Sequence, residues 1–342
     1  MKRIKRSPKP WLAALALLLS MSLCAHADTH RQRVLVALPA VYAITAALSE
    51  GTQIDVVRVP PDLSVPMQSQ ANALSRLAPS VFQQADAVVT LTSLWRADPL
   101  FAAARHHNLR IIEIDASRSW EPIRPGVAVA RVPANDVPWA RAGNPDSGLS
   151  PYPWLGPING MRMAALIAVD LARLAPADAA RIEGNLAALE SRLRELKATY
   201  GARMVALPDV RVLSLANEFI YLFGEFGVFV DGWFARQDIE WSDADRSALT
   251  QYLHERDIRV VVHKWAPDEK IARAISDAGA QLLILDTGNP GILADPKTRY
   301  EALLRANLDA LLAAFSAQGS TTAGAAPSPD STTTSTLEPH LK

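Results

Sequence analysis

The sequence predicts an α/β protein with two Rossmann-like lobes, each built on a parallel sheet, joined by a long backbone helix. Three observations support this prediction. Strand and helix patterns alternate over residues 34–114 and again over 211–316. The strands are largely apolar, as expected where helices cover both faces of a parallel sheet. Between the two regions, residues 150–200 carry a long helical pattern.

The stretch between the alternating regions begins with a turn rich in proline and aromatic residues, SPYPWLGP (150–157). Its helical part has one apolar stripe, because leucine and isoleucine recur at spacings of three and four from Ile182 to Leu196. Pro176 interrupts the pattern, and proline is tolerated in a first helical turn but not in a helix interior. We therefore expect two helical segments with a joint near 175–177.

The N-terminal lobe is predicted from four strands and the helices between them. The strands are expected at 34–38, 54–59, 87–92 and 110–114, and the helices at 40–50, 72–85 and 99–108. Prolines mark 60–66 as a loop. Residues 116–150 lack periodicity, and we expect a long irregular segment of the kind that often carries function.

The C-terminal lobe repeats the alternation. Strands are expected at 211–216, 229–234, 259–264 and 281–286, and helices at 218–227, 242–257, 266–279 and 296–316. Ser242 is the expected N-cap of the second of these helices. Residues 317–342 are rich in Ser, Thr, Ala and Pro without apolar periodicity, which predicts a disordered tail. The predicted division is an N-terminal lobe at 28–158, a linking helix at 159–201 and a C-terminal lobe at 202–316.

The first 27 residues are typical of a secretory signal peptide. A basic segment, MKRIKRSPKP, precedes the apolar run WLAALALLLSMSL and the small-x-small site Ala25-His26-Ala27. The apolar run is too short to span a membrane. We therefore expect cleavage after Ala27 and a periplasmic location.

Cleavage at this site changes the charge and the cysteine content. The whole chain has 35 basic and 35 acidic residues, and loss of five basic residues leaves 30 against 35. Nothing in this balance indicates a nucleic-acid partner. The only cysteine, Cys24, is also lost, so the mature chain has no disulfide and no thiolate metal ligand.

The predicted architecture also predicts where a ligand binds. Ligands of open α/β sheets bind outside the carboxyl ends of the strands. Two lobes of this kind turn those ends toward each other, so we expect the site between them. The segments expected to line it are 60–67, 92–96, 150–157, 216–221, 263–266 and 286–291.

Several segments, taken in order, resemble the periplasmic solute-binding proteins of zinc and manganese ABC transporters, the ZnuA/TroA-like family. They are VVRVPPD (56–62), QQADAVVTLTSLW (83–95), SPYPWLGPINGMRMAALIAVDL (150–171), LSLANEFIYLFGEFGV (213–228), RVVVHKWAPDEKIARAI (259–275) and LLILDTG (282–288). The resemblance covers roughly residues 33–316. It implies a rigid linking helix, limited hinge motion and delivery of a ligand to an ABC permease in the inner membrane.

The metal-ligand positions of that family are mostly substituted in this chain. Family members use three histidines, or two and a glutamate, plus a carboxylate. The histidine positions correspond to about Pro66, Tyr152 and Ala216, and the carboxylate corresponds to Asp286. Proline and alanine side chains cannot coordinate, whereas a tight Zn²⁺ or Mn²⁺ site needs imidazole nitrogen and carboxylate oxygen. The resemblance therefore implies a metal-type importer whose cargo is either a Zn or Mn ion in a non-standard site or a metal chelate.

Seven residues are candidates for contact with this cargo. The ligand-binding candidates are Trp95, Tyr152, Trp154, Asn217, Glu218 and His263, and the metal candidate is Asp286. Each has a structural alternative: the aromatic residues can pack between the lobes, and a carboxylate near a helix start is favoured by the helix dipole. Asp286 can equally close a loop, and His263 can be a hydrogen-bonded loop histidine.

Two other classes of function are alternatives to a transport role. The first is a degenerate binding protein that acts as a partner-binding accessory subunit without ion binding. The second is an enzyme, which the sequence disfavours because it has no Gly-x-Ser-x-Gly elbow, phosphate loop, Gly-x-Gly-x-x-Gly or His-Glu-x-x-His motif.

Overall fold

The computed structural model describes residues 31–121, 123–140 and 148–323, which form two lobes with one four-stranded sheet each. The strand order is β2-β1-β3-β4 in the N-terminal lobe and β6-β5-β7-β8 in the C-terminal lobe. Every neighbouring pair of strands is parallel. The predicted α/β fold is confirmed. The predicted signal peptide lies outside the described residues.

The described part of the N-terminal lobe contains one more α-helix than predicted, together with one short 3-10 helix. Its strands are β1 (Gln32–Val36), β2 (Ile54–Arg58), β3 (Ala87–Thr90) and β4 (Ile112–Asp115). Its helices are α2 (Pro39–Leu48), η1 (Met67–Ser69), α3 (Gln70–Leu74), α4 (Pro79–Gln83) and α5 (Leu100–His107). The single helix predicted over 72–85 is wrong, because Pro79 begins α4 and a proline cannot continue a helix from the preceding turn.

The C-terminal lobe follows the predicted alternation. Its strands are β5 (Arg211–Ser214), β6 (Phe229–Trp233), β7 (Val260–His263) and β8 (Gln281–Ile284). Its helices are α8 (Ile220–Phe226), η4 (Asp238–Glu240), α9 (Asp243–Glu255), α10 (Glu269–Asp277), η5 (Gly291–Ala294) and α11 (Tyr300–Ala323). Ser242 caps α9 through a capping box with Asp245, which confirms the predicted N-cap. Because α11 continues to Ala323, residues 317–323 are helical and the predicted start of the tail is wrong; the rest of that segment lies outside the described residues.

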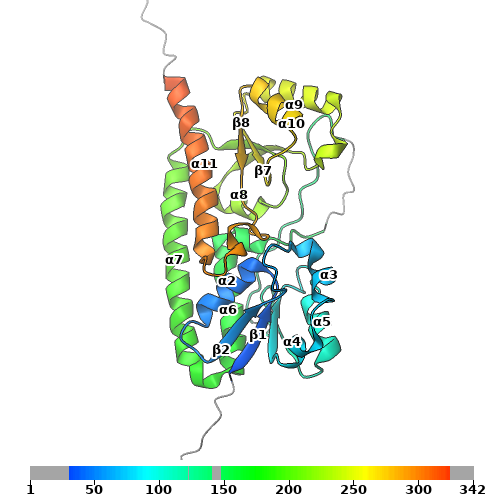
Figure 1. Ribbon diagram of the computed structural model, residues 1–342. Helices are drawn as coiled ribbons and strands as arrows, with labels where there is room; N and C mark the ends of the chain where they lie inside the picture. The colour runs from blue at the N-terminus through cyan, green and yellow to red at the C-terminus, as the bar shows by residue number, and fades with distance from the viewer. Residues whose placement is uncertain (1–30, 122, 141–147, 324–342) are drawn as a thin grey trace, which may run out of the picture.

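The connection between the lobes consists of two helices with a joint. The turn η2 (Pro153–Leu155) leads into α6 (Pro157–Leu174), and η3 (Pro176–Asp178) separates α6 from α7 (Ala179–Val205). This is the joint that Pro176 predicted. In Figure 1, α6 stays within the N-terminal lobe, while the 27-residue α7 runs beside both lobes. The bridging element is therefore α7.

Helices cover both faces of each sheet, and alternate strand residues pack toward opposite faces. In the N-terminal lobe Val34 and Val36 face α2 and α6, whereas Leu35 faces α3, α4 and α5. The cluster that contains Val34 continues through α7 into the C-terminal lobe as far as Phe315. The two lobes thus share one apolar core. Within the described part of the chain, no helix combines the length and the apolar character needed to cross a membrane.

Candidate functional site

Loops that follow strands of both sheets meet where the two lobes join. The backbone N–H of Met67, beyond the end of β2, donates a hydrogen bond over 2.7 Å to Oδ1 of Asn289, beyond the end of β8. The carboxyl ends of the two sheets therefore share one region. We define the lobe-junction site as five side chains in this region: Gln68, Tyr152, Glu218, Lys264 and Asn289.

Tyr152 lies at the centre of the neutral half of this site. Its hydroxyl oxygen accepts hydrogen bonds from the Gln68 side-chain amide over 3.3 Å and from the Asn289 side-chain amide over 3.4 Å. Burial, with a smaller contribution from the negative charge of Glu218, raises the pKa of the Tyr152 phenol. The phenol is thus protonated at neutral pH, and its own O–H remains available as a donor.

Glu218 and Lys264 form the charged half of the site. Glu218 follows β5 and is 6% exposed, and its Oε1 accepts a hydrogen bond from Nζ of Lys264, which follows β7. The other carboxylate oxygen, Oε2, is buried and has no hydrogen-bond partner among the described residues. Such an oxygen is costly to bury, which marks Glu218 as a position that a ligand's hydrogen-bond donor would stabilise.

His263 lies next to this ion pair, but its ring is engaged by contacts within the protein. Its Nδ1 accepts a hydrogen bond of 2.8 Å from the backbone N–H of Lys264, and its ring contacts that of Trp265 at a centroid distance of 4.9 Å. Burial lowers the pKa of His263 to about 4. The ring is therefore neutral with its proton on Nε2, so neither nitrogen offers a free lone pair to a metal ion.

Asp286 has both carboxylate oxygens bound to backbone amides. Oδ1 accepts from the N–H of Gly288 over 2.7 Å, and Oδ2 accepts from the N–H of Ile292 over 2.6 Å. Gly291 has φ of +49°, and a Cβ atom at this position would lie 1.8 Å from Oδ1 of Asp286. The loop thus closes tightly around the carboxylate, which supports the loop-closing alternative for this residue.

The remaining candidates from the sequence occupy different surroundings. Trp154 is fully buried, and its indole N–H donates to the carbonyl of Thr287 over 2.8 Å, so it anchors the turn before α6 to the C-terminal lobe. Trp95 is partly buried and packs against the shared core. Asn217 is half-buried beside Glu218. The structure therefore brings Tyr152 and Glu218 together, while Trp154 and Asp286 support the frame around them.

Three members of the site were not predicted from the sequence: Gln68, Lys264 and Asn289. They lie in loops that come together only through packing of the lobes. Lys264 and Asn289 do fall within segments expected to line the site, and His263-Lys264 at a strand end was the available signal for the former. No periodicity marks Gln68.

The donors at this junction do not form a conventional metal centre. Across residues 31–121, 123–140 and 148–323, no three His, Cys, Asp or Glu side chains come together in a way that could hold a metal ion. The junction instead offers a phenol, two amides, one carboxylate and one ammonium group. This set can bind hydrogen-bonding and charged groups of an organic molecule.

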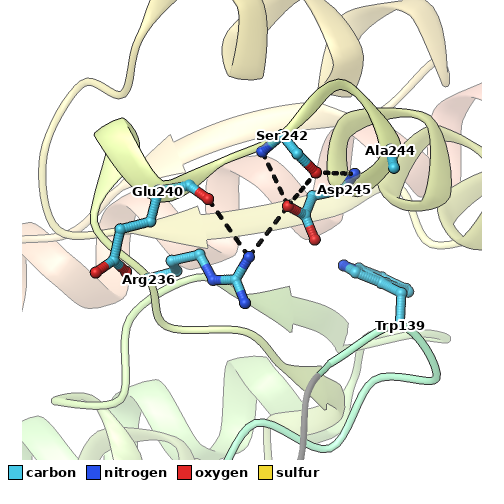
Figure 2. A pocket seen from close by; sticks show the side chains of 6 residues that line it. All are labelled: Trp139, Arg236, Glu240, Ser242, Ala244 and Asp245. Atoms are coloured by element: carbon cyan, nitrogen blue, oxygen red, sulfur yellow. Dashed lines mark hydrogen bonds and ion pairs between the residues drawn. The ribbon is translucent and has the colours of Figure 1, made fainter.

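The hollows on the described surface include two that none of the seven candidate residues lines, although Thr92 and Ser93, from a segment expected to line the site, do line the second. Figure 2 shows a hollow of about 570 Å³ at the start of α9, where Arg236 bonds to Asp245 over 3.0 Å and Trp139 forms the opposite wall. A second hollow of about 360 Å³ is lined by residues at the ends of β3 and β4 and by Trp120. In the first of these hollows Arg236 pairs with Asp245, and Asp245 also belongs to the capping box of α9.

Comparison with protein families finds a match over most of the chain. The family model described as zinc-uptake complex component A, periplasmic (ZnuA), matches residues 68–314. This range contains all five residues of the lobe-junction site. No curated protein sequence gives a significant match.

Solved structures show the same fold at low sequence identity. FpvC from Pseudomonas aeruginosa in complex with Mn²⁺ is 22% identical with a TM-score of 0.64, and the alignment covers 84% of this chain and 100% of FpvC. The metal-dependent lipoprotein YcdH from Bacillus subtilis is 18% identical with a TM-score of 0.65, covering 83% and 99%. The Zn(II)-bound ZnuA-like domain of AdcA from Streptococcus pneumoniae is 17% identical with a TM-score of 0.63, covering 83% and 99%.

Proposed function

We propose that this chain, which belongs to the periplasmic zinc-uptake complex component A (ZnuA) family, captures a metal cargo at its lobe junction and delivers it to an ABC permease. The observation that carries the proposal is the family match over residues 68–314, which spans both lobes and every junction residue. The family consists of solute-binding proteins, so we propose binding and delivery without catalysis.

The class of cargo is supported by the structural relatives. FpvC is described with Mn²⁺ and with Ni²⁺, and AdcA is described with Zn(II). We propose that this chain likewise handles a transition metal, either as an ion or as a metal chelate. Residues 1–27 direct the chain to the periplasm in this proposal, and the permease of the inner membrane is its partner.

The contact residues that we propose are those of the lobe-junction site. Tyr152 takes the place of a family histidine and provides a phenol, and Glu218 provides a carboxylate whose Oε2 has no partner among the described residues. Asp286 and His263 have their acceptor atoms occupied by backbone amides. Trp154 and Asp286 position the site, and Tyr152 and Glu218 contact the cargo.

Family membership favours transport over the alternative of an accessory subunit that binds only a partner protein. An accessory subunit has no need of a buried carboxylate with an unpartnered oxygen at the lobe junction, because desolvating that oxygen destabilises the fold. A transported cargo that donates a hydrogen bond to this oxygen would compensate for its burial.

Metal uptake in cells tests the proposed function. Cells that lack this chain but keep the permease should accumulate less of one transition metal under metal limitation, as measured by elemental analysis of washed cells. The full chain should restore uptake, and a variant that lacks residues 1–27 should not, because it stays in the cytoplasm. Equal contents of Mn, Fe, Co, Ni, Cu and Zn in all three strains would contradict a transport role.

A further inference from the structure

We propose that Lys264 is a built-in counter-ion that keeps bare divalent cations out of the lobe junction, so that the site admits a metal only within an anionic chelate. This inference rests on the proposed function and specifies the chemical form of the cargo. The contacts of one carboxylate, Glu218, support it.

Glu218 is already paired with a cation of the protein. A buried carboxylate without a partner is the group that a divalent cation would seek. The ammonium group of Lys264 is bound to Oε1 of Glu218, and the Glu218 side chain is only 7% exposed. A divalent cation at Glu218 would have to displace this ammonium group or bind beside a like charge in a poorly solvated place, and both are unfavourable.

Lys264 is held in place by contacts beyond its ion pair. Its Nζ lies 4.5 Å from the centroid of the Trp265 ring, a cation–π contact that adds to the ion pair. The Trp265 indole donates to Asp238 over 3.3 Å, and the Lys264 backbone N–H is bound to His263. Three contacts thus fix the backbone, the ammonium group and the aromatic surface beneath it.

Both members of the ion pair can still bind groups of a ligand. The Lys264 side chain is 25% exposed, and an ammonium group has three donors, of which Glu218 takes one. Oε2 of Glu218 still needs a donor, and the Tyr152 O–H and the amides of Gln68 and Asn289 lie on the neutral side. An anionic oxygen on Lys264 and an O–H or N–H on Glu218 satisfy both atoms. Carboxylate- or catecholate-bearing metal chelates present the anionic oxygens, and a metal-bound water or an amide N–H of the chelate presents the donor.

Calorimetric titration of tag-free, metal-stripped full chain with Mn²⁺ and with Zn²⁺ tests the exclusion of bare ions. The wild type should bind neither ion tighter than millimolar. Lys264→Gln should bind at least one of them tenfold or more tightly, because Glu218 is then free to coordinate. Lys264→Arg keeps the cation and should show no gain. Tight ion binding by the wild type, or no gain in Lys264→Gln, would overturn the inference.

Binding of an anionic chelate is tested by the same titration with three probes: ferric citrate, ferric tris(2,3-dihydroxybenzoate) and Zn(II)–EDTA. The metal-free chelator is the control for each. At least one complex should bind the wild type at micromolar concentration, and Lys264→Gln should lose tenfold or more in affinity while Lys264→Arg retains it. Failure of all three probes, or equal binding by Lys264→Gln, would overturn the assigned cargo.

Lys264→Gln leaves Glu218 without its partner, so misfolding alone could abolish binding by this variant. A double variant separates the two causes. The double variant Glu218→Gln/Lys264→Gln replaces the ion pair by two neutral amides of similar shape. It should bind no ions and should lose chelate binding tenfold or more; undiminished chelate binding in this variant would contradict the inference. The outcomes separate the two proposals: tight ion binding by the wild type overturns the inference and supports metal transport, whereas absence of any metal effect in the cellular uptake assay overturns the proposed function.

Discussion

Arg58 at the end of β2 donates a hydrogen bond of 2.7 Å to the carbonyl of Leu293 in η5, which joins the two lobes through a buried guanidinium group. The same group donates to the carbonyl of Leu63 over 3.0 Å and to that of Ala294 over 3.4 Å. No carboxylate among the described residues forms an ion pair with it, and burial lowers the pKa of Arg58. Carbonyl oxygens alone therefore compensate for the burial of this charge.

Replacement of Arg58 by Met should weaken the contact between the lobes. The buried carbonyls of Leu293 and Leu63 lose their donor, and we expect a loss of about 3 kcal/mol in the free energy of unfolding. Urea denaturation followed by circular dichroism measures this loss. Arg259→Met is the matched control, since its ion pair with Asp257 is exposed and should change stability by less than about 0.5 kcal/mol. Equal effects of the two changes would contradict the role of Arg58.

The Trp154 indole provides a second contact between the lobes. Trp154→Phe keeps an aromatic ring but removes the donor to the Thr287 carbonyl, so we expect a loss of about 1.5 kcal/mol plus a smaller packing loss. Trp265→Phe also removes an indole donor, but its hydrogen bond to Asp238 is exposed and 3.3 Å long, so this change should cost less than about 0.5 kcal/mol. Thermal unfolding of both variants compares them directly, and a larger shift for Trp265→Phe would show that Trp154 is not an anchor.

Asp286 and Gly291 should act as one structural unit. Asp286→Ala removes the acceptor for Gly288 and Ile292 and should cost about 2 kcal/mol, and Gly291→Ala should cost at least as much because its Cβ meets the carboxylate. In the Asp286→Ala background the Gly291→Ala change should cost less than in the wild type, since the carboxylate is gone. A double-mutant cycle of unfolding free energies measures this coupling, and additive effects would argue against it.

His263 should make the fold sensitive to acid. Its folded pKa of about 4 lies below the unfolded value of about 6.5, so the folded state binds its proton less tightly. The stability that results is complete above pH 6.5 and is lost as the pH falls toward 4, by about 3 kcal/mol at most. Urea midpoints between pH 7.5 and 4 should therefore fall less steeply in His263→Asn, whose side chain can still accept from Lys264. Parallel curves for the two proteins would rule out His263 as the cause.

The sequence predicted the features that depend on local chemistry. Pro176 marked the joint between α6 and α7, and Ser242 marked the start of α9, because backbone chemistry fixes both. The helix predicted over 72–85 is wrong because Pro79 begins a separate helix, α4. The strand pattern was sufficient for both sheets since apolar runs between helices favour parallel pairing.

The site itself was only partly predictable, because its members acquire their roles from tertiary contacts. Glu218 was recognised as a candidate, but its pairing with Lys264 depends on how β5 lies beside β7. The family resemblance made Asp286 a possible metal ligand. The hydrogen bonds that occupy its carboxylate depend on how the loop of Gly288 and Gly291 folds back. Composition and spacing carry no information about such contacts.

The packing of α11 has a consequence for how the chain matures. This 24-residue helix, the last described element, lies against α7 and β8 and also contacts α2 of the N-terminal lobe. The N-terminal lobe therefore lacks part of its cover until α11 has been synthesised. Native folding is completed late, and the first lobe cannot reach its final stability while the second is still emerging.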